Sequence, residues 1–131
     1  MPYGQVNADT IQSSTAGTPP VFKDGSGNEI GTLCRAWVNF NGLSGASPVI
    51  RASFNVSSIS YYASGNYGIS FTNALTDANY SIEMNCRHPS YHINSVIYPD
   101  GSTNGVARVF AYNSSFSATT DAQYVCVSIF R

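Results

Sequence analysis

Short alternating segments, each followed by turn residues, constrain the fold of this 131-residue chain more than any other feature. The clearest is TLCRAWVNFNG, residues 32–42, in which one alternating set is apolar: Cys34, Ala36, Val38 and Phe40. Because successive side chains of a strand point to opposite faces, this set predicts a core face. The other set places the chain's one tryptophan beside a fixed positive charge: Arg35, Trp37 and Asn39. A tryptophan and an arginine on the face opposite the core predict that another surface packs against this strand.

Similar segments recur along the rest of the chain. Further strands are expected at Ile50–Val56, Tyr67–Phe71, Tyr80–Cys86, Val106–Tyr112 and Gln123–Phe130. The stretches between them, such as NGLSGASP and YPDGSTNG, are rich in turn residues, and no window has a 3.6-residue period. The pattern therefore predicts an all-β protein with little helix, folded as an antiparallel, jelly-roll-like β-sandwich.

The N-terminal stretch differs from the remainder. Residues 1–31 contain three prolines, several glycines and only scattered apolar residues, so they cannot bury enough surface to fold alone. We expect an extended arm over residues 1–31 and the β-sandwich over residues 32–131. Within the arm, FKDGSGNEIG predicts a turn in which Asp-Gly supplies a positive φ. A calcium loop starting at Asp24 is disfavoured, because Glu29 stands at the glycine position and Arg35 at the final glutamate position.

The composition excludes several classes of function. Only 10% of residues are charged and the formal net charge is −1, which offers no electrostatic footprint for nucleic acid or an anionic membrane. Serine, asparagine and threonine make up 40 of the 131 residues, so the surface is expected to be polar without charge. No apolar run approaches the roughly 18 residues of a membrane-spanning helix, and the first residues lack the pattern of a signal peptide.

Candidate catalytic and metal-binding groups are sparse. The three cysteines lie in alternating apolar segments and are expected to be buried, reduced and unreactive: Cys34, Cys86 and Cys126. The densest polar cluster is CRHPSYHIN, but Pro89 stands between its two histidines, and zinc would need further ligands from elsewhere. The acidic residues are isolated in sequence. We therefore expect neither an enzyme nor a metal or cofactor site.

Three long stretches carry a resemblance to a known group of proteins. GTLCRAWVNFNG, then VIRASFNVSSIS, then GNYGISFTNALTDANYSI resemble a pattern in appendage proteins of tailed bacteriophages. In that family a CRAWVNFNG-like strand precedes an I-R-x-S-x-N-V-S-S-I segment, a G-x-Y-x-I/V-x-F-T-x-A hairpin and a D-A-N-Y turn. The corresponding stretches here are Cys34–Gly42, Ile50–Ile59, Gly65–Ala74 and Asp77–Tyr80.

The resemblance implies a homotrimeric virion structural protein, made in the host cytoplasm and carried on the particle. Three arms wound together would bury their apolar residues and attach the protein to other virion proteins; these residues are Val6, Ile11, Val21 and Phe22. Arg35 and Trp37 become candidates for a subunit interface, where arginine and aromatic residues are enriched. The alternative is that Trp37 caps the core of its own subunit and Arg35 stacks on it.

Two functions compete at this point. The first is a short tail fibre or fibre tip whose β-domain binds a host-surface receptor, expected to be a glycan. Its candidate contact residues are Tyr61, Tyr62, His88, Tyr91 and His92, which offer stacking and hydrogen-bonding groups. The second is a capsid decoration or head-fibre protein that binds only other virion proteins.

Overall fold

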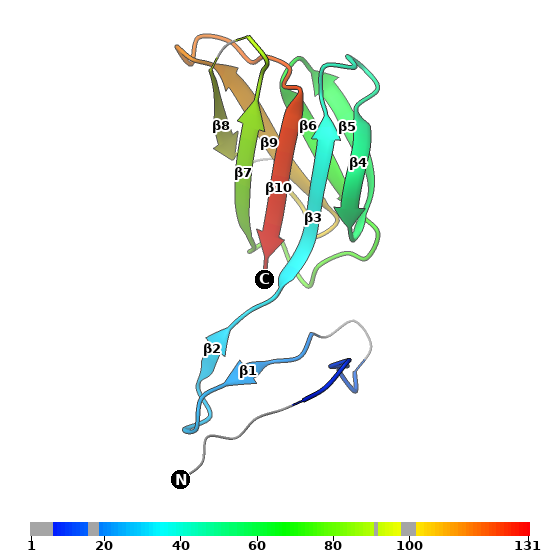
Figure 1. Cartoon of the computed structure of the whole chain (residues 1–131), viewed down its shortest axis with the longest axis vertical. Helices are drawn as coiled ribbons and strands as arrows, with labels where there is room; N and C mark the ends of the chain where they lie inside the picture. Colours follow the sequence, from blue (N-terminus) through cyan, green and yellow to red (C-terminus); the bar gives the residue numbers. More distant parts are fainter. Residues whose placement is uncertain (1–6, 16–18, 91, 98–101) are drawn as a thin grey trace. The chain divides into compact units, whose positions relative to one another are not determined.

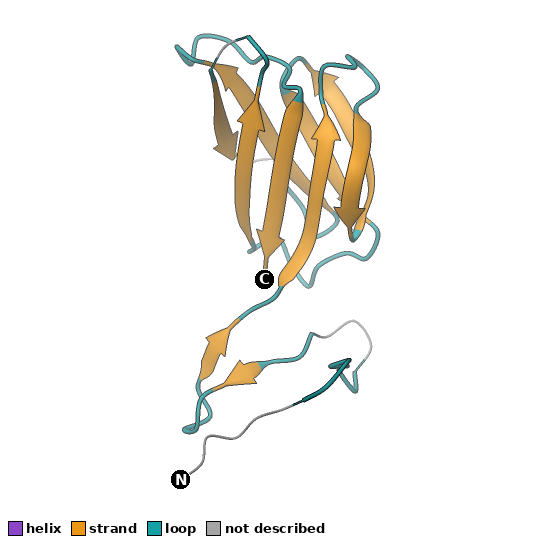
Figure 2. Ribbon diagram, in the orientation of Figure 1, coloured by secondary structure: helices purple, strands orange, loops and turns teal. Residues whose placement is uncertain are grey.

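The computed structural model describes residues 7–15, 19–90, 92–97 and 102–131. The chain divides into two compact units, Met1–Leu33 and Cys34–Arg131. The second unit consists of two four-stranded antiparallel sheets packed face to face as a sandwich, and the described residues include no helix (Figure 1, Figure 2). The all-β antiparallel sandwich predicted from the sequence is confirmed.

Each sheet combines strands from both halves of the second unit. The first sheet has the order β4-β3-β10-β7. Its strands are β3 (Cys34–Asn41), β4 (Val49–Phe54), β7 (Ser81–Arg87) and β10 (Tyr124–Phe130). The second sheet has the order β5-β6-β9-β8. Its strands are β5 (Val56–Ala63), β6 (Asn66–Phe71), β8 (Ile93–Ile97) and β9 (Val106–Asn113). The β3–β4, β5–β6 and β8–β9 connections stay within one sheet, and the other connections cross between the sheets.

The connections gather at the two ends of the sandwich (Figure 1). The chain enters at Cys34 and leaves beside it, because Phe130 near the C-terminus pairs with Cys34. The β3–β4, β5–β6, β7–β8 and β9–β10 connections lie at the opposite end. The second unit therefore has an entry end and a loop-rich far end.

The core lies between the two sheets and contains the predicted face of the TLCRAWVNFNG strand. Ala36, Val38 and Phe40 are at most 2% exposed. The Phe40 ring meets the edge of the Tyr67 ring, which is also fully buried, at a centroid distance of 5.0 Å. The inward residues of β6, β9 and β10 complete the core, including Ile69, Phe71, Ala107, Val109, Ala111, Val125, Val127 and Ile129.

The expected alternation over Ile50–Val56 holds at Ile50 and Val56 but is wrong at Ala52 and Phe54. A β-bulge between β3 and β4 pairs Asn39 with Ala52 but Phe40 with Ile50, so Arg51 is an extra residue on β4. Such a bulge reverses which residues of the strand face inward. Ile50 therefore packs against the core, whereas Phe54 lies on the outer face of the sheet and is 54% exposed.

Asn55 forms the corner at which the chain passes from β4 to β5. Its φ of 54° lies in the left-handed region, which asparagine tolerates better than most residues. Its side-chain amide donates to the carbonyl oxygens of Arg35 at 3.0 Å and Asn73 at 3.1 Å, and its side-chain oxygen accepts from the Asn73 N–H at 2.8 Å. One side chain thus fastens the corner to two other segments.

The expectation that all three thiols are buried is wrong for Cys126. Its residue lies on the outer face of β10, between Asn39 of β3 and Asn85 of β7, and is exposed. The apolar alternation of β10 belongs to its neighbours Val125 and Val127 instead. Cys34 and Cys86 are half-buried, and none of the three forms a disulfide.

The first unit contains a small hairpin formed by β1 (Phe22–Lys23) and β2 (Glu29–Gly31). The predicted turn is present, but the positive φ of 88° belongs to Gly27 and not to the Asp-Gly glycine. One oxygen of Asp24 accepts the N–H groups of Ser26 and Asn28 at 2.9 and 2.8 Å, and the other accepts the Asn28 side-chain amide at 3.0 Å. These bonds lower the pKa of the Asp24 carboxyl and engage both its oxygens in closing the turn.

Candidate functional site

The outer face of the first sheet carries an apolar surface centred on two large rings. Trp37 lies directly opposite Phe54 across the β3–β4 ladder, and the two residues are 39% and 54% exposed. Cross-strand aromatic pairs of this kind contribute roughly 0.2–1 kcal/mol to the sheet. Val49 and Leu43 extend the exposed apolar area along β4 and the preceding loop. We call this set, Trp37, Phe54, Val49 and Leu43, the tryptophan face.

A guanidinium stacks on an aromatic ring beside this surface, but it belongs to Arg51. Its Cζ lies 4.4 Å from the centroid of the Tyr124 ring. Its two terminal nitrogens donate to the Asn39 side-chain oxygen at 3.1 Å and the Gln123 carbonyl at 2.8 Å. Arg35, the arginine singled out in the sequence, is half-buried. Arg51 gave no sequence signal, because its outward position results from the bulge.

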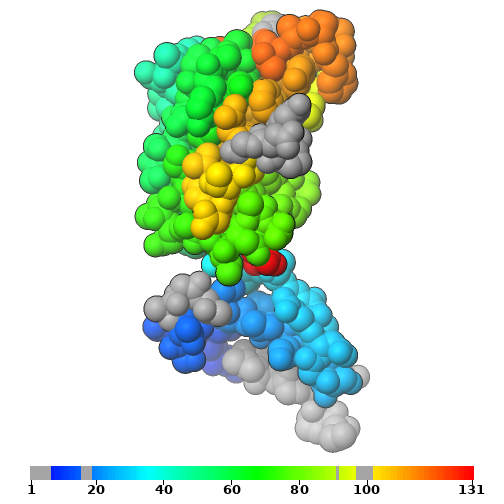
Figure 3. Space-filling view, turned by 180° about the vertical axis from the view of Figure 1, so that it is seen from behind, coloured from blue at the N-terminus to red at the C-terminus, as the bar shows by residue number. Residues whose placement is uncertain are grey.

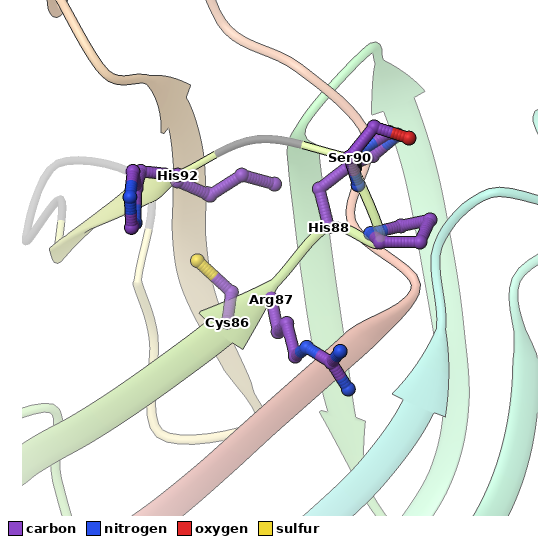
Figure 4. A pocket seen from close by; sticks show the side chains of 7 residues that line it. Cys86, Arg87, His88, Ser90 and His92 are labelled. Carbon is purple, nitrogen blue, oxygen red and sulfur yellow. Dashed lines mark hydrogen bonds between the residues drawn. The ribbon is translucent and has the colours of Figure 1, made fainter.

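The β7–β8 connection forms a pocket of about 460 Å³ at the far end of the sandwich. Its lining residues are Cys86, Arg87, His88, Pro89, Ser90, His92 and Ile93. Cys86 and Arg87 leave β7 on opposite sides, with the Cys86 sulfur on the side of His92 (Figure 4). The two histidines of the CRHPSYHIN cluster are therefore brought to one pocket, whereas Tyr91 lies outside the described residues.

The groups in this pocket suit hydrogen bonding better than covalent chemistry. Nδ1 of His88 accepts the Ser90 N–H at 3.1 Å, which orients the ring. Burial raises the pKa of the Cys86 thiol to about 11, so the reactive thiolate is scarce at neutral pH. Over the described ranges, no three His, Cys, Asp or Glu side chains are grouped closely enough to hold a metal ion.

The two tyrosines predicted to act together at residues 61 and 62 point to opposite sides of β5. Tyr61 is half-buried, and its hydroxyl donates to Asp121 at 3.3 Å. Tyr62 lies on the outer face of the second sheet and is 52% exposed. The structure therefore brings neither tyrosine to the histidine pocket, and of this pair only Tyr62 offers a large exposed ring.

Asp121, in the β9–β10 connection, gathers a polar cluster that the sequence did not reveal. Its Oδ1 accepts the Gly65 N–H at 2.7 Å and the hydroxyl of Tyr67 at 2.9 Å. Tyr67 is fully buried, and this burial, together with the neighbouring carboxylate, raises the pKa of its hydroxyl above the ordinary value of about 10. The cluster joins the β5–β6 turn to the β9–β10 connection and thereby supports the far end.

The arm residues proposed for trimerisation are exposed where they are described. Ile11 is 64% exposed, Val21 52% and Phe22 41%, and Val6 lies outside the described residues. Ile30 on β2 is 66% exposed as well. The described part of the first unit therefore has apolar side chains without a core to cover them.

Comparisons with family models, with curated proteins and with solved structures find no match to this chain. Within the described residues, no helix is long and apolar enough to cross a membrane. The functional argument consequently depends on the surfaces described above.

Proposed function

We propose that this chain is a non-enzymatic structural subunit of a tailed-bacteriophage virion, a short tail fibre or fibre-tip component, and that it assembles as a homotrimer. The observation that carries the proposal is the tryptophan face. A single chain leaves two large rings and two aliphatic side chains exposed on one face of its sandwich. A pair of large exposed rings on a sheet face suits a protein interaction site.

A second copy of the chain is the partner that best fits this face. Permanent interfaces between identical subunits are more apolar than other protein surfaces, and they favour aromatic residues over lysine and glutamate. Trp37 lies near the middle of the first sheet, where a ring of this size can act as a hot spot. The resemblance of the TLCRAWVNFNG region to phage appendage proteins gives the expected number of copies as three.

The arm supplies the proposed attachment to other virion proteins. Its described apolar residues are 41% to 66% exposed: Ile11, Val21, Phe22 and Ile30. Burial of such side chains contributes roughly 25 cal/mol per Å² of apolar surface removed from water. Contacts with two further arms and with the particle would provide that burial.

Sedimentation equilibrium over a range of concentrations tests the assembly. The wild type is expected to remain trimeric at concentrations where Trp37→Ala dissociates to monomers. Phe116→Ala is the matched control, because Phe116 is 59% exposed but lies on the β9–β10 connection. A wild type that stays monomeric throughout overturns the trimer, and a Trp37→Ala protein as stably trimeric as the wild type removes the tryptophan face from the interface.

Cys126 provides an independent readout of the same face. It lies opposite Asn39 on β10, next to Ser128, which pairs with Trp37. A thiol reagent is therefore expected to label Cys126 slowly in the assembled wild type and rapidly in the Trp37→Ala monomer. Equal rates in the two proteins would contradict burial of this face on assembly.

Recognition of a host-surface glycan is the proposed activity of the far end. The histidine pocket supports it, because two imidazoles, a hydroxyl and a guanidinium line a cavity large enough for one or two sugar rings. On a glycan array, His88→Ala and His92→Ala should lose the signal of the wild type. Thr76→Ala, an exposed position in the β6–β7 connection, should retain that signal.

The alternative is a decoration or head-fibre protein without receptor binding. The extent of exposed apolar surface in the arm and on the tryptophan face favours it, since both surfaces suit protein partners. A stable trimer that enters particles through residues 1–31, yet binds no glycan on the array, would select this alternative.

A further inference from the structure

Figure 3 shows the second unit from the side of its second sheet. The outer face of that sheet carries a row of aromatic rings interrupted by one cation. The row starts on β5, runs along β9 and continues into the β9–β10 connection. Its members are Tyr62, Arg108, Phe110, Tyr112 and Phe116. Successive aromatic centroids on β9 and beyond are 6.3 and 6.2 Å apart. We call this row the aromatic strip.

Tyr62 and Arg108 are held against each other at one end of the strip. The Arg108 Cζ lies 3.9 Å from the centroid of the Tyr62 ring. A glycine, Gly68, lies beneath the ring, where an added Cβ would come within 2.7 Å of the Tyr62 Cε2. Asn66 accepts a hydrogen bond from Nη2 of Arg108 at 2.8 Å. These contacts hold the pair in place, and Tyr62 is still 52% exposed.

No carboxylate in the part of the chain that the structure describes forms an ion pair with Arg108. Among the described residues that point outward from β5, β6, β8 and β9, Arg108 is the charged one. Its Nε is buried and out of reach of a ligand, so the donors that a ligand can use are those of the terminal nitrogens, of which Nη2 already donates to Asn66. An arginine with unused donors beside an aromatic ring suits a planar anion, because its fork of N–H groups matches a carboxylate.

The corresponding pair on the first sheet has fewer donors available to a ligand. Arg51 also stacks on a tyrosine, Tyr124, but both of its terminal nitrogens donate to protein oxygens. Arg108 has one such bond, to Asn66. The two pairs share their chemistry and differ in the donors left for a ligand.

We propose that the aromatic strip binds an acidic polysaccharide, with a sugar ring stacked on Tyr62 and its carboxylate paired with Arg108. Aromatic faces pack against the C–H groups of a sugar ring, and a row of rings suits a chain of sugars. The large exposed apolar residues on this strip are aromatic, Tyr62 and Phe116, whereas the tryptophan face also exposes aliphatic Val49 and Leu43. That difference favours a sugar here and a protein partner there.

The inference rests on the proposed function in one respect. Assembly through the first sheet leaves the second sheet facing outward, since the two sheets are opposite faces of the sandwich. The strip and the histidine pocket share no residue, and Tyr62 and Arg108 lie at the end of the strip away from Tyr112, which pairs with Asn94 beside the pocket. Variants therefore distinguish the two sites.

Isothermal titration of the purified full chain tests the proposal. The probes are polygalacturonate, alginate and polysialic acid, each compared with neutral dextran, and methyl-esterified polygalacturonate removes the charge while it keeps the ring. The wild type should bind at least one acidic probe, and esterification or added salt should weaken that binding. Tyr62→Ala and Arg108→Gln should each weaken it roughly tenfold or more, which corresponds to the loss of one good contact.

Tyr124→Ala and Arg51→Gln are the matched controls and should bind as the wild type does. Gly68→Ala adds a test that keeps both side chains but displaces the Tyr62 ring, and it should also weaken binding. Each variant is checked for a native circular dichroism spectrum.

Three results would overturn the proposal. They are no binding of any acidic probe, equal binding of the acid and its ester, or an equal loss of binding in the Tyr62 and Arg108 variants and in the Tyr124 and Arg51 variants. Sedimentation of Tyr62→Ala separates this result from assembly. The variant should remain trimeric, and loss of sugar binding by an intact trimer would then be an effect on the strip alone. If the wild type is monomeric and still binds the sugar, the trimer is overturned and the strip proposal stands.

Discussion

Replacement of Asp121 by alanine should destabilise the sandwich more than any other single loss of a carboxylate. Its side chain accepts from Gly65 at 2.7 Å, from Tyr67 at 2.9 Å and from Tyr61 at 3.3 Å. Gly65 and Tyr67 are buried, so their donors would lose a charged acceptor without easy access to water. A bond of this kind is worth about 1.5 kcal/mol or more, so two of them predict a loss of about 3 kcal/mol in the free energy of unfolding.

The size of this effect is measurable by urea denaturation and thermal unfolding, followed by circular dichroism. For a unit of this length, about 3 kcal/mol lowers the melting temperature by roughly 12–24 °C. Asp77→Ala is the matched control. Asp77 pairs with Arg131 at 2.7 Å, but the two side chains are 36% and 41% exposed. Solvent screens a surface pair of this kind, so Asp77→Ala should lower the free energy of unfolding far less than Asp121→Ala.

A double-mutant cycle identifies the bond responsible. Tyr67→Phe removes the hydroxyl and keeps the ring that packs on Phe40. Because the two changes remove the same hydrogen bond, their combined cost should be smaller than the sum by about 1 kcal/mol or more. Additive effects, or an Asp121→Ala protein as stable as Asp77→Ala, would refute the argument that Asp121 supports the far end.

Three further predictions concern other parts of the second unit. Gly65→Ala should lower the free energy of unfolding by about 2–5 kcal/mol, because the added Cβ would meet backbone atoms within 2.6 Å at a φ of 66°. Gly45→Ala, at a φ of 63° with open space around the added Cβ, should lower it by only about 1–2 kcal/mol. At pH 8, under conditions that keep the chain monomeric, iodoacetamide should label the exposed Cys126 well before Cys86, because burial raises the pKa of the Cys86 thiol to about 11. Mass spectrometry measures both rates, and equal rates would contradict the burial described for Cys86. The free energy of unfolding should fall as the pH rises above about 10, because the unfolded chain then releases the Tyr67 proton, whereas the folded state retains it through its raised pKa. In urea titrations at alkaline pH, the free energy of unfolding of Tyr67→Phe should fall less steeply.

Much of the fold follows from local alternation in the sequence. The inward set of β3 is as predicted, because an uninterrupted strand keeps its period of two. The period fails where the ladder has a bulge, so unbroken alternation over Ile50–Val56 predicts Phe54 on the inner face, whereas it lies on the outer face. The predicted strands omit β5, which lies between two segments of clearer alternation, and β8, whose first residues belong to the polar CRHPSYHIN cluster; for β8 the alternation of Ile93 with Ile97 around Ser95 is the available signal.

The candidate sites were less predictable, because they depend on contacts between residues distant in sequence. The histidines, four residues apart, could be grouped from the sequence, and the pocket contains both. Arg108 and Tyr62 are 46 positions apart and meet only through pairing of β5, β6 and β9. Asp121 and Tyr67, 54 positions apart, meet for the same reason.

The separation of the entry end from the far end also affects how the protein can change. The four connections at the far end are remote from Cys34 and from the C-terminus, so changes in their length need not disturb the place where the chain enters the sandwich. Surface connections tolerate insertions better than the strands that they join. A peptide inserted in the 44–47 stretch of the β3–β4 loop, beyond Leu43, should therefore be displayed without loss of the fold, whereas the β5–β6 turn, tied to Asp121 through Gly65, should accept none. The sandwich is in this respect a scaffold whose loops can diversify at different rates.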